Sequence, residues 1–79
     1  GIDYFTIQFI RNKEAVNRGF RFIVEESSNL TFNGAEAVFM ATESISATHE
    51  RVTYRSSAPI NEASACFFKL QVQQPSDGF

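Results

Sequence analysis

The sequence predicts an α+β fold: a four-stranded, mostly antiparallel sheet with one helix packed on one face, in the order ββαββ. Three segments, residues 4–10, 20–26 and 64–74, alternate apolar and polar side chains as half-buried strands do. Residues 51–56 form a shorter strand candidate. Residues 35–50 have an apolar stripe and an acidic stripe on opposite sides of a helix, which is what a helix lying on a sheet requires.

The first two predicted strands each have one apolar side. Their inward residues are Phe5, Ile7 and Phe9 in the first strand and Phe20, Phe22 and Val24 in the second. The connection, residues 11–19, is polar and ends in Gly19, which predicts a loop or one short helical turn with a glycine stop. This connection is short enough for antiparallel pairing of the first two strands, and the same holds for the last two. In the last strand the predicted inward residues are Cys66, Phe68, Leu70 and Val72.

The segment 35–50 fits a helix better than a strand. Two sets of residues recur every seven positions, about 160° apart on a helix of 3.6 residues per turn. They are the apolar Val38, Ile45 and Val52 and the acidic Glu36, Glu43 and Glu50. Asn33 is placed to cap this helix, with Glu36 completing a capping box. The weak helix formers in the segment, Thr42, Ser44, Ser46 and Thr48, oppose it, but packing usually outweighs propensity. The alternative is an all-β sandwich or barrel in which Asn33-Gly34 turns a hairpin.

The 79 residues, 43% of them hydrophobic and nine of them phenylalanine, suffice for one domain with one core. We expect a single α+β domain over residues 1–74 and a flexible tail over 75–79. In element order and size this arrangement resembles a β-grasp domain. The resemblance is one of architecture only. The ubiquitin-type carboxyl-terminal Gly-Gly is absent, since the chain ends Asp77, Gly78, Phe79, so conjugation is not supported.

The composition argues against several classes of protein. A net charge of -2 makes a dedicated nucleic-acid binder unlikely. One cysteine cannot form an intramolecular disulfide, and no apolar run is long enough for a membrane span. The unpaired cysteine and the absence of a signal peptide slightly favour the cytoplasm.

The residues that could support chemistry are few. Cys66 and His49 could suggest a nucleophile and its base, but Cys66 falls on the apolar side of a strand, where a cysteine behaves as a small hydrophobe. One histidine and one cysteine offer no metal-ligand spacing. We therefore predict no catalytic residues, no metal, no cofactor and no small-molecule ligand.

Several large apolar residues fall at positions predicted to face outward. We predict that four of them bind a partner: Tyr4, Ile23, Phe39 and Phe67. The alternative is that several of them belong to the core, because a register shift of one residue exchanges the two faces of a strand. At least one strand edge is also expected to stay uncovered, because Lys69 is the only lysine in any predicted strand and neither proline lies inside one.

The leading functional hypothesis is therefore a non-catalytic protein–protein interaction module, or a small subunit of a larger assembly, that self-associates or binds another protein through its sheet face or edge. The alternative is a nucleic-acid-binding regulator that uses the outer sheet face. That face would offer Arg21, Arg51, Arg55 and Lys69 with the aromatic Tyr4 and Phe67. A small enzyme or enzyme subunit is the third hypothesis.

Overall fold

The computed structural model, which describes residues 2–62 and 65–75, is all-β apart from two short helical segments. Its elements are β1 (Tyr4–Asn12), α1 (Lys13–Asn17), β2 (Arg21–Ser27), β3 (Val38–Ser44), β4 (His49–Pro59), the 3-10 turn η1 (Ile60–Glu62) and β5 (Phe67–Gln73). The α+β prediction is wrong, because no helix packs on a sheet in the described part of the chain. The predicted tail over 75–79 lies outside the described residues except for Pro75.

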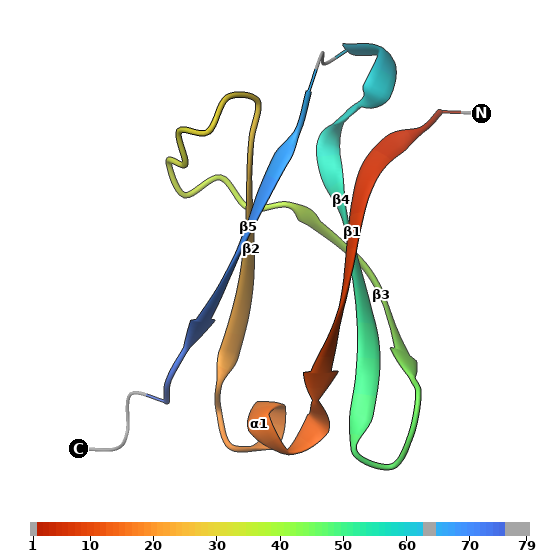
Figure 1. Cartoon of the computed structure of the whole chain (residues 1–79), viewed down its shortest axis with the longest axis vertical. Coiled ribbons are helices and arrows are strands. Elements are labelled where there is room, and N and C mark those ends of the chain that lie inside the picture. Colours follow the sequence, from red (N-terminus) through yellow and green to blue (C-terminus); the bar gives the residue numbers. More distant parts are fainter. Residues whose placement is uncertain (1, 63–64, 76–79) are drawn as a thin grey trace.

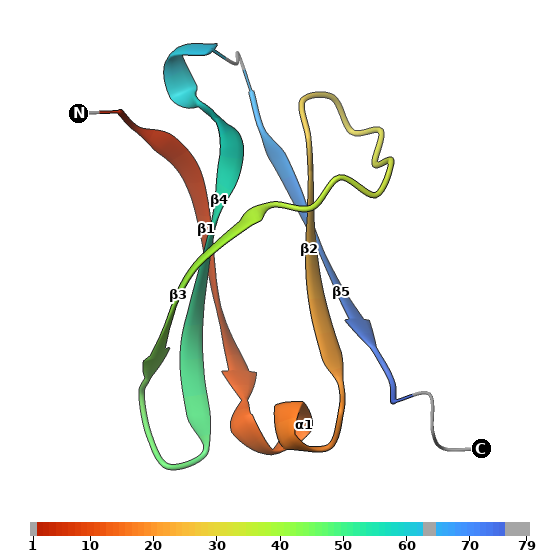
Figure 2. The same cartoon turned by 180° about the vertical axis from the view of Figure 1, so that it is seen from behind.

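The five strands form two facing antiparallel sheets. One has the order β1-β4-β3 and the other pairs β2 with β5. The inner faces meet where Phe9 of β1 stacks on Phe22 of β2, with ring centroids 6.3 Å apart. Figures 1 and 2 show the two sheets edge-on, with α1 connecting β1 to β2 at one end.

The helix predicted over residues 35–50 is instead part of a β-hairpin formed by β3 and β4. The turn is closed by the backbone N–H groups of Ile45 and Ser46, which both donate to the carbonyl oxygen of His49. The Ser46 hydroxyl accepts the N–H groups of Thr48 and His49, at 3.2 and 3.1 Å. Serine and threonine compete with a helix in this way by bonding nearby backbone groups, and here that local chemistry outweighs the seven-residue pattern.

The residues of the seven-residue pattern do not lie on one face in the hairpin. Val38 lies in β3, Ile45 in the turn and Val52 in β4, so the successive members do not form one stripe. Val52 is fully buried in the middle of β4, whereas Ile45 is 46% exposed in the turn. Glu43 and Glu50 accept hydrogen bonds from two different arginines, one on each face of the sheet.

The pairing of consecutive strands was also predicted incorrectly. β1 pairs with β4, and β2 pairs with β5, because α1 carries the chain from one sheet to the other. Asn33-Gly34 forms no two-residue turn: Gly34, with φ +85°, lies in the longer loop between β2 and β3. The strand positions themselves and the short helical turn that ends near Gly19 (φ +93°) are confirmed.

The approach to β3 joins the two sheets. Ala37 donates its N–H to the carbonyl oxygen of Val24 and Glu26 donates to that of Ala35, so residues 35–37 run along β2. The chain then continues into β3, which pairs with β4 in the other sheet. Figure 2 shows this crossing between the sheets. Counted through residues 35–37, the strands follow one another in the order β5-β2-β3-β4-β1, like a barrel that has not closed.

The core of this open barrel is small. Among residues 2–62 and 65–75 the buried apolar residues are Val24, Ala37 and Val52, and the buried polar one is Ser56. The molecule measures only 13 Å along its shortest axis. Strands about 4.8 Å apart make a sheet of three strands roughly 10 Å wide, so most inner side chains lie near an edge. A sandwich this narrow leaves much of its inner surface half-exposed.

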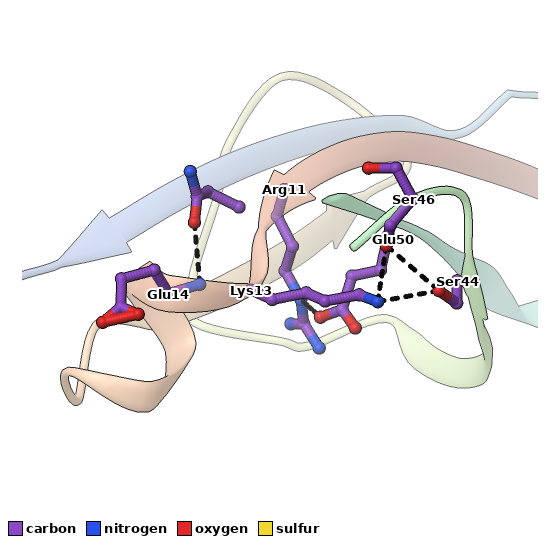
Figure 3. Close-up of polar contacts among 7 residues, drawn as sticks. Arg11, Lys13, Glu14, Ser44, Ser46 and Glu50 are labelled. Carbon is purple, nitrogen blue, oxygen red and sulfur yellow. Dashed lines mark hydrogen bonds and ion pairs between the residues drawn. The ribbon is translucent and has the colours of Figure 1, made fainter. Parts of the chain in front are cut away.

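Polar contacts connect the end of β1 to the hairpin turn between β3 and β4, as Figure 3 shows in close-up. The Lys13 ammonium donates to the Ser44 hydroxyl and to the Ser46 carbonyl oxygen, both at 2.7 Å. The Arg11 Nε donates to Glu50 at 2.5 Å, in a pair whose side chains are 17% and 15% exposed. These bonds hold the turn against the end of β1.

Candidate functional site

The side of the molecule opposite β3 has two uncovered strand edges. Residues 35–37 run along β2 and lead into β3, the outer strand of the three-stranded sheet, so this segment links the two sheets on one side of the molecule. The edges of β1 and β5 both lie on the opposite side. In the described part of the chain no strand pairs with either edge. We call this region the open side. It comprises the edge residues Thr6, Gln8 and Ile10 of β1 and Phe68, Leu70 and Val72 of β5.

The free backbone groups of β1 follow from the hydrogen bonds of its two ends. Phe5 donates its N–H to the Ser56 hydroxyl at 3.2 Å, and Lys13 donates to the Thr48 carbonyl oxygen at 2.9 Å. Both groups therefore point toward β4. Since backbone groups alternate along an antiparallel strand, the N–H and C=O groups of Thr6, Gln8 and Ile10 point to the open side.

The same alternation identifies the free groups of β5. Val24 and Glu26 of β2 use their backbone groups to bind residues 35–37. The intervening residues of β2 are therefore the ones that bond β5, and their partners are Phe67, Lys69, Gln71 and Gln73. The remaining residues of β5, Phe68, Leu70 and Val72, direct their N–H and C=O groups to the open side.

The two edges run in the same direction. β5 is antiparallel to β2, residues 35–37 are antiparallel to β2 and continue into β3, and β3 and β1 are both antiparallel to β4. With five strands in that order, the first and the last are parallel to each other. One further strand running the opposite way would therefore be antiparallel to both edges.

Apolar side chains line the inner surface beside the open side. Leu70 and Val72 lie opposite Val24 and Phe22 and so face inward, yet they are 42% and 52% exposed. On the outer surface of the same region Ile10 is 52% exposed. Natural sheet edges are usually protected by lysine, proline or a bulge. Here β5 has Lys69, and β1 has a register shift only near its start, between Tyr4 and Thr6.

A cavity of about 360 Å³ lies at the other end of the sheets from α1. It is lined by strand ends, by the loop after β2 and by the chain before β5, with Phe5, Glu26, Ser56 and Cys66 among its residues. Both carboxylate oxygens of Glu26 accept the N–H of Ser57, at 3.0 and 3.1 Å. This bond connects β2 to β4, so the Glu26 carboxylate in the cavity wall helps to hold the two sheets together.

Cys66 lies in the wall of this cavity, far from His49. Burial, and secondly the negative charge of Glu26, raise the pKa of the Cys66 thiol. A raised pKa lowers the thiolate fraction, which is the reactive form. His49 begins β4 at the opposite end, and its Nδ1 lies 2.8 Å from the Thr48 hydroxyl. The structure therefore does not bring these two residues together.

The four predicted partner-binding residues are spread over the molecule. Tyr4 lies on the outer face of the three-stranded sheet, under the guanidinium of Arg55 at 4.1 Å from its ring centroid. Ile23 and Phe67 share the outer face of the two-stranded sheet but sit four pairs apart along it. Phe39, 53% exposed, packs edge-on against Tyr54 on the inner side of β3, 5.6 Å between centroids. They do not form one patch.

The basic platform considered for nucleic acid is divided as well. Arg51 and Arg55 lie on the outer face of one sheet, and Arg21 and Lys69 on that of the other. Arg51 donates to Glu43 at 2.6 Å, and Arg55 donates to the Ser56 carbonyl oxygen at 2.7 Å. No single face therefore presents all four cations.

No cluster of three or more metal-ligating side chains occurs among residues 2–62 and 65–75. Within the same residues no helix has the length and hydropathy needed to cross a bilayer. Comparisons with protein-family models, with curated proteins and with solved structures find no match to this chain.

Sequence reasoning expected an uncovered edge but did not locate it. The free groups of Thr6, Gln8 and Leu70 depend on which strands pair, and the pairing joins residues about fifty positions apart in the chain, such as Thr6 and Arg55. The one local sign was that β1 contains neither lysine nor proline.

Proposed function

We propose that this chain is a non-catalytic interaction module that binds protein by adding a partner strand at the open side. The observation that supports the proposal is the pair of parallel, uncovered edges on one side of an unclosed barrel. An extended partner chain placed there gains backbone hydrogen bonds from one or both edges, the mode known as β-augmentation.

The inner surface favours a partner of a particular pattern. A strand between β1 and β5 would turn every second side chain toward Ile7, Leu70 and Val72, and the others toward solvent. A segment that alternates apolar and polar residues therefore fits this site. Burial of Leu70 and Val72, both about half exposed, would add to the hydrogen bonds.

A peptide titration tests the proposal. The probe is a synthetic peptide of nine residues, the length of β1, with alternating valine and threonine and a lysine at each end. It is added to the ¹⁵N-labelled chain, up to about 1 mM, where weak complexes form. We expect amide shifts concentrated at Thr6, Gln8, Ile10, Phe68, Leu70 and Val72. The β3 edge and the outer faces should not respond.

The matched control is the same peptide with alternate backbone nitrogens methylated. Methylation removes the donors for one of the two hydrogen-bond ladders but keeps every side chain, so binding should weaken at least tenfold. Equal binding of both peptides, or shifts spread over the outer faces, would contradict strand addition.

A further inference from the structure

We infer that the strand that occupies the open side comes from a second copy of this chain, in a twofold dimer that pairs β1 with β1 and β5 with β5. This inference rests on the proposed strand-binding function and names its partner. It follows from the shared position, shared direction and similar level of the two edges.

A twofold axis perpendicular to the sheets satisfies both edges at once. Rotation by 180° about such an axis reverses strand direction, so each edge meets its own copy in antiparallel orientation. Because β1 and β5 lie on the same side and run the same way, one rotation forms both pairs. The result is a sandwich with six strands in one sheet and four in the other, closed across the former open side.

The two edges also lie at compatible heights for a single axis. Phe9 stacks on Phe22, and Phe22 pairs with Val72, so Phe9 and Val72 lie at the same level. β1 and β5 run in the same direction, so two residues before Phe9 and Val72 lie Ile7 and Leu70, at one level. One residue before Phe9 and Val72, Gln8 is level with Gln71 in the same way. Gln8 is the middle residue of β1 (Tyr4–Asn12), and Leu70 is the middle residue of β5 (Phe67–Gln73). An axis near these residues gives both strands nearly full overlap.

The charge of Lys69 favours the same position of the twofold axis along β5. An axis through Lys69 would place two ammonium groups directly opposite each other, which is unfavourable. An axis at Leu70 places Lys69 opposite Gln71 of the partner copy, and an axis at Gln71 places it opposite Gln73. Near the middle of β1, Thr6, Ile7, Gln8 and Phe9 carry no charge.

The area available is sufficient for a specific dimer. The nine residues of β1 span about 30 Å, and two sheets about 10 Å apart with their outer side chains are roughly 20 Å wide. The open side thus offers about 600 Å² per copy, or about 1,200 Å² in all, the lower end of the range for stable interfaces. A second copy also covers Leu70 and Val72, which a one-sheet contact would leave exposed.

Two variants of Gln8 test the dimer in the full chain. Gln8→Pro removes a backbone N–H that points to the open side and leaves the bonds to β4 in place. Gln8→Ala removes the same side chain, including its bond to the Thr53 hydroxyl, and keeps the N–H. By sedimentation velocity from micromolar to near-millimolar concentration, we expect twice the monomer mass for the natural chain and for Gln8→Ala. Gln8→Pro should stay at the monomer mass while its circular dichroism remains native.

Disulfide trapping fixes the location of the axis. In a Cys66→Ala background, Gln8→Cys and Gln71→Cys each lie beside the axis on opposite outer faces, and mild oxidation should yield covalent dimers of at least one of them. Thr53→Cys lies one strand further from the axis, at about 14 Å from its copy, too far for a disulfide. Its failure to cross-link is the matched control.

The outcomes separate the dimer from the proposed function. A natural chain that is monomeric throughout but binds the valine–threonine peptide overturns the dimer and leaves strand binding in place. A monomer that also ignores the peptide overturns both. A dimer that survives Gln8→Pro, or that cross-links through Thr53→Cys as readily as through Gln8→Cys, uses another surface and overturns the inference.

Discussion

Replacing Ser56 by alanine should destabilise the fold much more than its small size suggests. Ser56 is 2% exposed, and its hydroxyl both accepts the N–H of Phe5 at 3.2 Å and donates to the carbonyl oxygen of Ala58 at 2.6 Å. It sits where the pairing of β1 with β4 shifts from Thr6–Arg55 to Tyr4–Pro59, so that Phe5 alone faces Ser56, Ser57 and Ala58. The serine hydroxyl thus replaces the ladder bonds that this bulge interrupts.

The magnitude follows from the two groups that Ser56→Ala leaves without a partner. A buried donor or acceptor left unpaired costs about 1–3 kcal/mol, and Phe5 and Ala58 are only half-buried, so we expect about 2–3 kcal/mol in all. A domain of this size has a stability of about 4–12 kcal/mol, so the loss is a large fraction. The melting temperature should fall by roughly 10–20 °C.

Urea and thermal unfolding followed by circular dichroism measure this loss. The control is Ser57→Ala, the exposed neighbour, which keeps the backbone N–H that Glu26 accepts and should change stability by less than about 0.5 kcal/mol. Equal and small effects from the two variants would refute the account of the bulge, since Ser56 would then contribute no more than any surface serine.

Two further predictions concern the charged and sulfur-containing side chains. Arg11→Met should cost about 1.5–3 kcal/mol in urea unfolding, because it leaves the half-buried Glu50 carboxylate without its partner, whereas Glu43→Gln at an exposed pair should cost about 0.2–1 kcal/mol. A loss from Arg11→Met no larger than that from Glu43→Gln would contradict this. Cys66 should react with iodoacetamide more slowly than a free cysteine at neutral pH, and the rate should rise only at a more alkaline pH, because its pKa is raised. Glu26→Gln removes the lesser cause of that shift and should speed the reaction at a given pH; a natural chain that reacts as fast as free cysteine would contradict the assignment.

The strands could be predicted from the sequence because alternation is a local property. Each of the four predicted strands overlaps an observed one, and Phe5, Ile7 and Phe9 share a face as expected. The hairpin over residues 38–59 was missed because a seven-residue recurrence was given more weight than composition. Thr42, Ser44, Ser46 and Thr48 indicated the correct result: they disfavour a helix, and the Ser46 side chain caps the turn that replaces it.

The candidate site could not be predicted in the same way. Whether Leu70 is covered depends on whether another strand lies beside β5, and that depends on pairings between distant segments. Local periodicity can identify only side chains that point outward, such as Ile23 and Phe67, and these were therefore predicted to bind a partner. The open side instead consists of free backbone groups and of inward apolar side chains at the margin of a narrow sandwich. Neither feature requires a particular residue type, so the sequence alone does not identify it.

The crossing of residues 35–37 from β2 to β4 also has a consequence for the order in which the chain folds. Among the strand pairs in the described residues, only β3 with β4 joins strands that follow each other in the chain, whereas Tyr4 pairs with Pro59 and Arg21 with Gln73. Pairing of distant segments first costs the entropy of closing a long loop, and the favourable contacts form only afterwards. Folding of such topologies therefore takes milliseconds to seconds. We expect the β3–β4 hairpin, with its Ser46 turn, to form first and to template β1. During synthesis β1 emerges well before β4, so the edge of β1 that pairs with β4 stays uncovered until about fifty further residues have been made.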